Sequence, residues 1–173
     1  MFSDPIKNLK QLGLREDMLV ADLGAGTGFY SIPSAKIVTR GKVYAIEIIK
    51  EYVATIKNKA HQEHLKNIEC FWGNIEKIRG TRIKDGIIDA VIVSNIFSQI
   101  EDKEKFIAET KRILKVGGKV LFIDWSELSV FGPKRDKIII KEKAIQFLTK
   151  KGFVYERDIS AGEHHYGMIL KKL

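Results

Sequence analysis

The chain has 173 residues, of which 45% are hydrophobic and 30% are charged. This length predicts a single domain over residues 1–173 that buries its own core. One cysteine excludes an internal disulfide, and no cysteine cluster exists to hold a metal. No segment resembles a signal peptide or approaches about 18 uninterrupted apolar residues, so we expect a cytoplasmic protein without a membrane span.

Positive charge exceeds negative charge. Lys and Arg number 30 against 22 Asp and Glu, which gives a net charge of +8. Such an excess is compatible with binding to nucleic acid. The lysines, however, recur from Lys7 to Lys172 and are interleaved with glutamates, which favours a solvated basic surface. Nucleic acid is therefore an open but disfavoured partner.

Strand and helix patterns alternate along the chain after a short leading helix. Asp4 and Pro5 have the residue types of an N-cap and a first helical turn, and apolar residues at helical spacing follow until Gly13. Apolar runs then predict strands over 18–23, 42–48, 67–72, 87–94 and 119–125. Periodic apolar residues predict helices over 29–38, 50–65, 103–114 and 137–151.

Two further strands, 153–157 and 165–170, have no helix between them and should pair antiparallel. The alternation of helices with nearly continuous apolar strands predicts a doubly wound α/β fold. Its sheet is mainly parallel, with helices on both faces and an antiparallel edge. Ligands of such sheets bind beyond the carboxyl ends of the strands, where strand order reverses.

The loop after the first strand reads DLGAGTG over residues 22–28. A dinucleotide fingerprint needs a small residue at position 29, where this chain has Phe29. The spacing fits G-x-G-x-G preceded by an acid, Asp22. A carboxylate there repels a pyrophosphate and attracts an ammonium, which favours S-adenosylmethionine over NAD.

Later strand ends carry polar side chains that suit the rest of that cofactor. Glu47 lies 19 residues after Gly28 and can accept both ribose hydroxyls, a feature shared with NAD sites. Asn74 can bond the adenine amino group, and Ile75 can cover the ring. Glu47 as a solvated acid and Asn74 as a turn residue are the alternatives.

Over almost its whole length the sequence resembles the class I S-adenosylmethionine-dependent methyltransferases. The most similar branch acts on small molecules and includes quinone-biosynthesis and type 11 members. The resemblance rests on VADLGAGTGFY (20–30), KVYAIEI (42–48), GNIEKI (73–78), IIDAVIVSNIF (87–97) and RILKVGGKVLFIDW (112–125). It implies a Rossmann-like sheet of seven strands in the order 3-2-1-4-5-7-6, with strand 7 antiparallel.

The same resemblance implies a cofactor site. Asp22, Gly24 and Gly26 would hold the methionine part, Glu47 the ribose and Asn74 the adenine edge. Two residues that end the fourth strand would face the methyl group. The full set of expected cofactor-binding residues is Asp22, Gly24, Ala25, Gly26, Tyr30, Glu47, Ile48, Asn74, Ile75, Ser94 and Asn95.

Methyl transfer from a sulfonium is a direct displacement, so a base is needed only if the acceptor must lose a proton. The candidate bases are Asp124, His164 and His165. The candidate acceptor contacts are the aromatic residues Phe97, Trp125 and Tyr166. For each of these sets, a structural role in the core or in a polar hairpin is the alternative.

These observations predict a methyltransferase that uses S-adenosylmethionine, releases S-adenosylhomocysteine and acts on a small-molecule acceptor. Two alternatives stay open: a methyltransferase of RNA or protein, and a non-catalytic partner subunit that binds S-adenosylmethionine. A homodimer is also compatible with the sequence.

Overall fold

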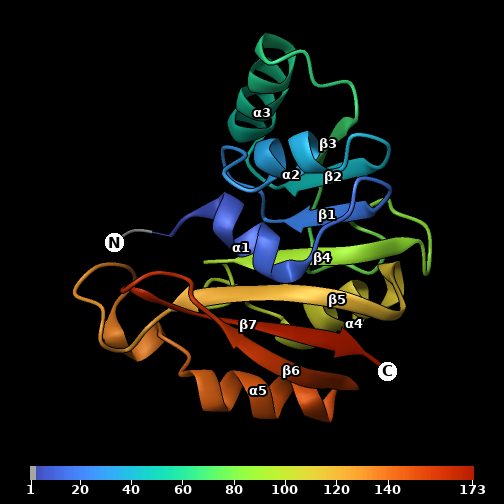
Figure 1. Cartoon of the computed structure of the whole chain (residues 1–173). Coiled ribbons are helices and arrows are strands. Elements are labelled where there is room, and N and C mark those ends of the chain that lie inside the picture. Colours follow the sequence, from blue (N-terminus) through green and yellow to red (C-terminus); the bar gives the residue numbers. More distant parts are fainter. Residues whose placement is uncertain (1–2) are drawn as a thin grey trace.

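The computed structural model describes residues 3–173. Its seven-stranded sheet has the order β3-β2-β1-β4-β5-β7-β6 (Figure 1), which confirms the expected topology. β1 pairs parallel with β2 and β4, β2 with β3, and β4 with β5, whereas β7 runs antiparallel to both β5 and β6. No helix within the described residues is long and apolar enough to span a membrane.

The elements alternate as the sequence pattern predicts. The strands are β1 (Leu19–Leu23), β2 (Lys42–Glu47), β3 (Ile68–Trp72), β4 (Ile88–Ser94), β5 (Leu114–Trp125), β6 (Phe153–Ile159) and β7 (His165–Lys172). The helices are α1 (Pro5–Leu12), α2 (Ser31–Ile37), α3 (Lys50–Gln62), α4 (Lys103–Ile113) and α5 (Lys141–Lys150), with a 3-10 turn η1 (Arg135–Lys137) before α5.

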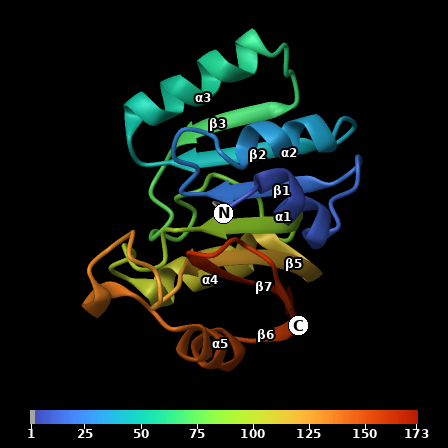
Figure 2. The ribbon, with the colours of Figure 1, turned by 60° about the vertical axis from the view of Figure 1, so that its left-hand side comes forward.

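Alternate residues of each buried strand serve opposite layers of the core. On β1, Val20 packs with Leu9 of α1 and Ala35 of α2, whereas Ala21 packs into the cluster that contains Phe106 of α4. The α5 residue Ala144 belongs to that second cluster. Helices therefore cover both faces of the sheet, with α1 and α2 on one side and α4 and α5 on the other (Figure 2).

Two predicted helix starts differ from the structure, and the predicted helix 50–65 ends three residues earlier, at Gln62. The helix after the glycine loop begins at Ser31 instead of residue 29, because the loop turns continue through Tyr30. The last helix begins at Lys141 instead of residue 137, since η1 and an extended segment precede it. The two later starts lengthen both loops at the carboxyl end of the sheet.

β5 begins at Leu114, five residues before the predicted start at 119. Leu114 pairs with Ile88, the first residue of β4, and the register of the two strands shifts before the next pair, Ala90 and Lys119. Gly117 adopts φ +76°, a left-handed conformation that glycine reaches without steric cost. Gly117 and Gly118 thus belong to an irregularity inside a long strand.

Candidate active site

The glycine loop leaves the carboxyl end of β1 in left-handed turns. Gly24 has φ +71° and Gly26 has φ +54°. A Cβ on Gly24 would lie 2.8 Å from Cγ2 of Ile96, whereas a Cβ on Gly26 would enter open space. The backbone N–H of Gly24 donates to the carbonyl of Ile46 at 2.9 Å. The loop is therefore tied to β2, and its Gly26 backbone faces an open region.

Glu47, the last residue of β2, connects two segments of the site. Its Oε2 accepts the N–H of Gly26 at 2.8 Å, and its Oε1 accepts the N–H groups of Ile48 and Ile49 at 2.8 and 3.0 Å. The residue is only 6% exposed. Because each carboxylate oxygen has two lone pairs, Oε2 retains one acceptor position for a ligand.

Three of the expected cofactor residues in and next to the loop, Asp22, Ala25 and Tyr30, are buried. Asp22 accepts the hydroxyl of Ser31 at 2.6 Å, and burial, with a smaller contribution from the charge of Glu47, raises the pKa of Asp22 to about 7. The Tyr30 hydroxyl accepts a hydrogen bond from Nδ2 of Asn8 at 2.9 Å. These side chains support the loop from behind.

A cavity of about 400 Å³ is lined by residues at the carboxyl ends of β1, β2 and β4. These strand ends lie at the left of Figure 1. The other eight expected cofactor residues line it: Gly24, Gly26, Glu47, Ile48, Asn74, Ile75, Ser94 and Asn95. Its size is that of a typical small-molecule site. The sequence analysis missed the lining residues Ile49, Tyr52, Glu76, Ile96, Gln99 and Ile100. Their only signal was their position just after a strand end.

The charge of this lining is negative. Among the described residues, Glu47 and Glu76 line the cavity and no lysine or arginine does. Such a wall repels a pyrophosphate and attracts a cation. Because S-adenosylmethionine carries an ammonium and a sulfonium, these acidic lining residues fit that cofactor better than a dinucleotide.

Asn95, directly after β4, combines backbone strain with an unpaired polar atom. Its φ is +57°, which is uncommon for a residue with a side chain. Its N–H donates to the carbonyl of Ile123 at 2.9 Å, but its buried Oδ1 has no hydrogen-bond partner among the described residues. A strained residue with an unpaired oxygen in a cavity wall is typical of a binding site.

The candidate bases are not among the residues that line this cavity. Asp124 is the next-to-last residue of β5. Its Oδ1 accepts the N–H of Trp125, while its buried Oδ2 lacks a partner within residues 3–173. Burial raises the pKa of Asp124 to about 6. His165 stacks on Trp125 with ring centroids 4.3 Å apart, and neither of its buried ring nitrogens is hydrogen-bonded in the part of the chain described. Burial lowers the pKa of His165, and the ring of His164 lies edge-on to Phe131.

The three expected acceptor contacts differ in position. Phe97 is 1% exposed and packs edge-on to Phe122, so the structure corrects its expected placement on an acceptor wall to the core. Tyr166 donates its hydroxyl to the carbonyl of Ile139 at 2.9 Å, and burial raises its pKa. Trp125 is partly exposed at the end of β5.

Comparison with known proteins identifies relatives of the whole fold. Residues 14–164 match the model of a family described as a methyltransferase domain. A SAM-dependent methyltransferase from Aquifex aeolicus has 30% identity and a TM-score of 0.91, over 99% of this chain and 91% of that one. A structure assigned to the type 11 methyltransferases, from Sulfolobus solfataricus, has 25% identity and a TM-score of 0.78, over 99% and 94%.

Curated relatives are longer. The ubiquinone/menaquinone biosynthesis C-methyltransferase UbiE of Francisella tularensis subsp. novicida is 29% identical over 151 residues, which are 83% of this chain and 57% of that enzyme. The Escherichia coli enzymes of the same name match over 45% of their length. This chain thus spans about half the length of the curated relatives it matches.

Proposed function

The chain belongs to the S-adenosylmethionine-dependent methyltransferases, and from that membership we propose that it transfers a methyl group from S-adenosylmethionine to a small-molecule acceptor. Residues 1–173 would act as one methyltransferase domain. The observation that carries the proposal is the acidic cavity at the glycine loop, with Glu47 and Glu76 in its wall and no lysine or arginine among the described lining residues.

The expected cofactor residues other than Ala25 and Tyr30 keep a proposed role. The backbone of Gly24 and Gly26 would hold the methionine part, and the buried charge of Asp22 would favour its ammonium. The free acceptor position on Glu47 Oε2 suits one ribose hydroxyl; a second hydroxyl requires Glu47 to release a backbone N–H.

Asn74 already uses its Oδ1 to accept the N–H of Glu76 at 2.8 Å, which orients the amide at the cavity wall. We propose that this amide borders the adenine, with Ile48 and Ile75 covering the ring. Ser94 and Asn95 end β4 on the other side of the cavity, where the unpaired Asn95 Oδ1 would face the reacting part of the cofactor.

When bound, S-adenosylmethionine supplies an electrophilic methyl group on a positively charged sulfur. The protein then needs to align the acceptor and exclude water, for which positioning is the main contribution. Asp124, with its pKa raised to about 6, and His165, whose ring is kept neutral by burial, are the residues proposed to take a proton from the acceptor.

A small-molecule acceptor is supported by the relatives, since the curated enzymes are named for quinone biosynthesis. The proposal commits to the acceptor class only. An acceptor screen would identify the atom that receives the methyl group.

Calorimetric titration with S-adenosylmethionine and S-adenosylhomocysteine tests the cofactor, with NADH as the control. We expect micromolar binding of the first two, about −8 kcal/mol, and none of NADH. Absence of binding by a folded sample would refute the proposed function. A screen of radiolabelled methyl transfer to phenols, quinols and amines then tests catalysis, and cofactor binding without transfer to any acceptor class would favour a non-catalytic partner subunit.

A further inference from the structure

A second cavity lies at the β3 edge of the sheet, next to the proposed cofactor site. It measures about 390 Å³ and shares Ile48, Gly73 and Asn74 with the first cavity. Its remaining lining residues are Trp72, Lys77, Arg79, Gly80 and Arg82. The two adjacent cavities therefore have opposite charge, since the first is acidic and the second is basic.

An aromatic side chain lines this basic cavity, and a further lysine contacts its ring. Trp72 ends the edge strand β3 with 50% of its surface exposed, although its indole N–H is held by the carbonyl of Ile48 at 2.8 Å. The ammonium of Lys50, at the start of α3, lies 4.3 Å from the centroid of the indole ring. The ring is thus oriented by two contacts and still presents apolar surface to solvent.

The loop that carries the other cations is fixed by a buried carboxylate. Glu109 of α4 is fully buried and accepts the N–H groups of Arg79 and Thr81 at 2.8 and 3.2 Å, as well as the Thr81 hydroxyl. Arg112 in turn pairs with Glu109 at 2.7 Å. The backbone that presents Arg79 is therefore anchored to the core.

The same loop holds two arginines in left-handed conformation, Arg79 with φ +63° and Arg82 with φ +59°. Non-glycine residues adopt this region at a cost, and such strain gathers at functional sites. Lys50, Lys77 and Arg82 form no ion pair among the described residues, and Arg79 has only a 3.4 Å contact with Asp85. Their charge is therefore available to an external anion.

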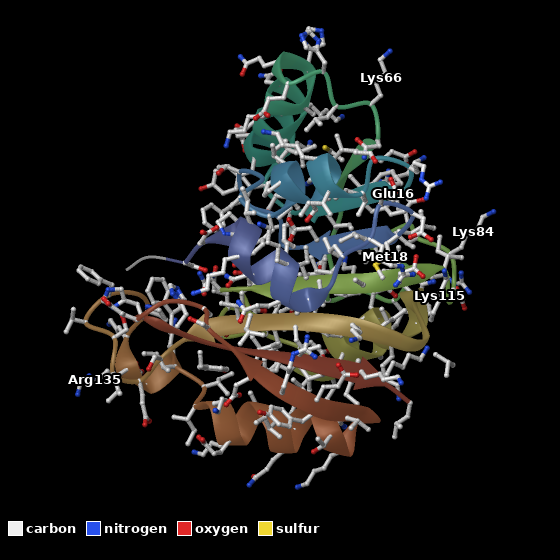
Figure 3. All side chains as sticks on the ribbon, viewed as in Figure 1. Glu16, Met18, Lys66, Lys84, Lys115 and Arg135 are labelled. Carbon is white, nitrogen blue, oxygen red and sulfur yellow. The ribbon has the colours of Figure 1, made fainter. Side chains whose placement is uncertain are left out.

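Positive side chains elsewhere are scattered. Arg135 projects from the loop after β5, whereas Lys84 and Lys115 lie at the opposite end of the sheet (Figure 3). Only the β3 edge joins four cations, an exposed tryptophan and a cavity within the described residues. Basic side chains around an aromatic ring are the combination by which proteins hold single-stranded nucleic acid.

We propose that Trp72, Lys50, Lys77, Arg79 and Arg82 form a binding site for single-stranded nucleic acid, with the cations on phosphates and the tryptophan against a base or sugar. All five side chains are exposed, at the end of the edge strand β3, in the loop after it and at the start of α3, which suits a continuous nucleic-acid strand better than an enclosed metabolite. This site does not depend on the proposed methyl-transfer function. It adds a ligand that would border the Asn74 end of the cofactor cavity.

Fluorescence anisotropy with a labelled 12-nucleotide oligouridylate is the direct test, with AMP and pyrophosphate as unlabelled competitors. We expect affinity to rise with strand length and to fall as salt increases. The Lys77→Gln/Arg79→Gln/Arg82→Gln variant should bind at least tenfold more weakly, with a log–log salt slope shallower by about 2. AMP or pyrophosphate competing as well as the strand would overturn the proposal in favour of a small-anion site.

Matched variants separate the site from general charge. The Lys143→Gln/Lys150→Gln/Lys171→Gln variant removes three exposed lysines from α5 and β7, beyond β5 from the β3 edge, and should keep the parental affinity. Trp72→Phe should retain binding and Trp72→Ala should lose about tenfold. Equal losses in both triple variants, or no binding by the parent protein, would overturn the proposal.

The Lys77→Gln/Arg79→Gln/Arg82→Gln variant also distinguishes this proposal from the proposed function. S-adenosylhomocysteine binding, measured by calorimetry, should stay within twofold of the parent because none of the three cations lines the acidic cavity. Thermal melting checks that each variant is folded. Loss of both ligands in a folded variant would contradict two separate sites.

Discussion

Two halves of the carboxyl end of the sheet differ in how completely their polar atoms are paired. In the half that we propose holds the cofactor (the cofactor half), at the ends of β1, β2 and β3, Glu47 accepts three backbone N–H groups and Asp22 accepts the hydroxyl of Ser31. In the half that we propose holds the acceptor (the acceptor half), at the ends of β4 and β5 and the start of β7, the residues Asn95, Asp124 and His165 carry buried polar atoms without partners in the described chain.

The difference indicates which half is complete before a ligand binds. Unpaired buried polar atoms cost stability and are rare in native proteins. The cofactor half satisfies its own groups and is preorganised, whereas the acceptor half leaves acceptors and ring nitrogens open beside the long segment 126–140 between β5 and α5. We expect changes in the first half to alter cofactor affinity and changes in the second to alter turnover.

Substitution of Phe97 should have the largest effect, and it acts on stability. Phe97 packs in the core and does not line the cavity. It is 1% exposed among the rings of Phe106, Phe122 and Phe147. Phe97→Ala should lower the free energy of unfolding by about 3–5 kcal/mol, measured by urea denaturation. Phe131→Ala, on the exposed loop, is the control; a loss below about 1 kcal/mol for Phe97→Ala would return Phe97 to the acceptor wall.

Alanine substitutions at Gly26 and at a matched glycine, Gly86, test the cofactor half. Gly26 and Gly86 both have left-handed φ, at +54° and +61°, and an added Cβ would meet nothing within 4 Å at either. Alanine at each should cost about 1 kcal/mol of stability through backbone strain. Only Gly26→Ala should weaken S-adenosylhomocysteine binding, by at least 100-fold in calorimetry. Equal binding by the two variants would move the cofactor away from the glycine loop.

The raised pKa of Asp22 makes the stability of the protein depend on pH. Its pKa of about 7 lies above the unfolded value near 3.9, so the folded state holds the extra proton between these values. The stability contributed by the protonated form is complete below pH 4 and is lost as pH rises through 7. Asp22→Asn, which keeps an acceptor for Ser31, should remove this loss, so its melting temperature relative to the parent should rise from pH 5 to pH 8.

The same substitution should weaken S-adenosylmethionine binding at pH 8 by about tenfold, because the ammonium loses a buried charge. Parental affinity should rise with pH through 7, and the affinity of Asp22→Asn should not follow it. Parallel pH profiles for parent and variant would contradict a charged role for Asp22.

Asp124 tests the acceptor half and has the smallest expected effect on the protein itself. Asp124→Asn should leave cofactor affinity within twofold and lower turnover of a phenolic or amine acceptor by at least tenfold. The pH–rate profile should lose its limb near pH 6, where the raised pKa lies. Asp158→Asn, a surface change on β6, is the control. A variant with unchanged turnover and an unchanged limb would assign Asp124 a structural role.

Much of the cofactor half followed from local pattern. An acid, three glycines and a following helix lie close together in the sequence. The polar residue Glu47 ends β2, and Asn74 follows the end of β3 by two residues. Because parallel strands bring their carboxyl ends to one edge, these residues were expected to converge, and Gly24, Gly26, Glu47 and Asn74 do line one cavity. Asp22 was harder to predict, since its burial depends on Ser31 and the packing of α2.

The alternation of apolar strands and amphipathic helices was sufficient to determine the fold class and the likeness to the family, because both depend on short-range periodicity and on contiguous motifs. Tertiary packing alone decided that Phe97 is core, that β5 continues through Gly117, and that Trp72 and Arg79 meet at a second cavity. The physical reason is that these features depend on contacts between residues far apart in the sequence. Burial, unpaired polar atoms and the charge of a cavity all arise from such contacts, so no local sequence pattern predicts them.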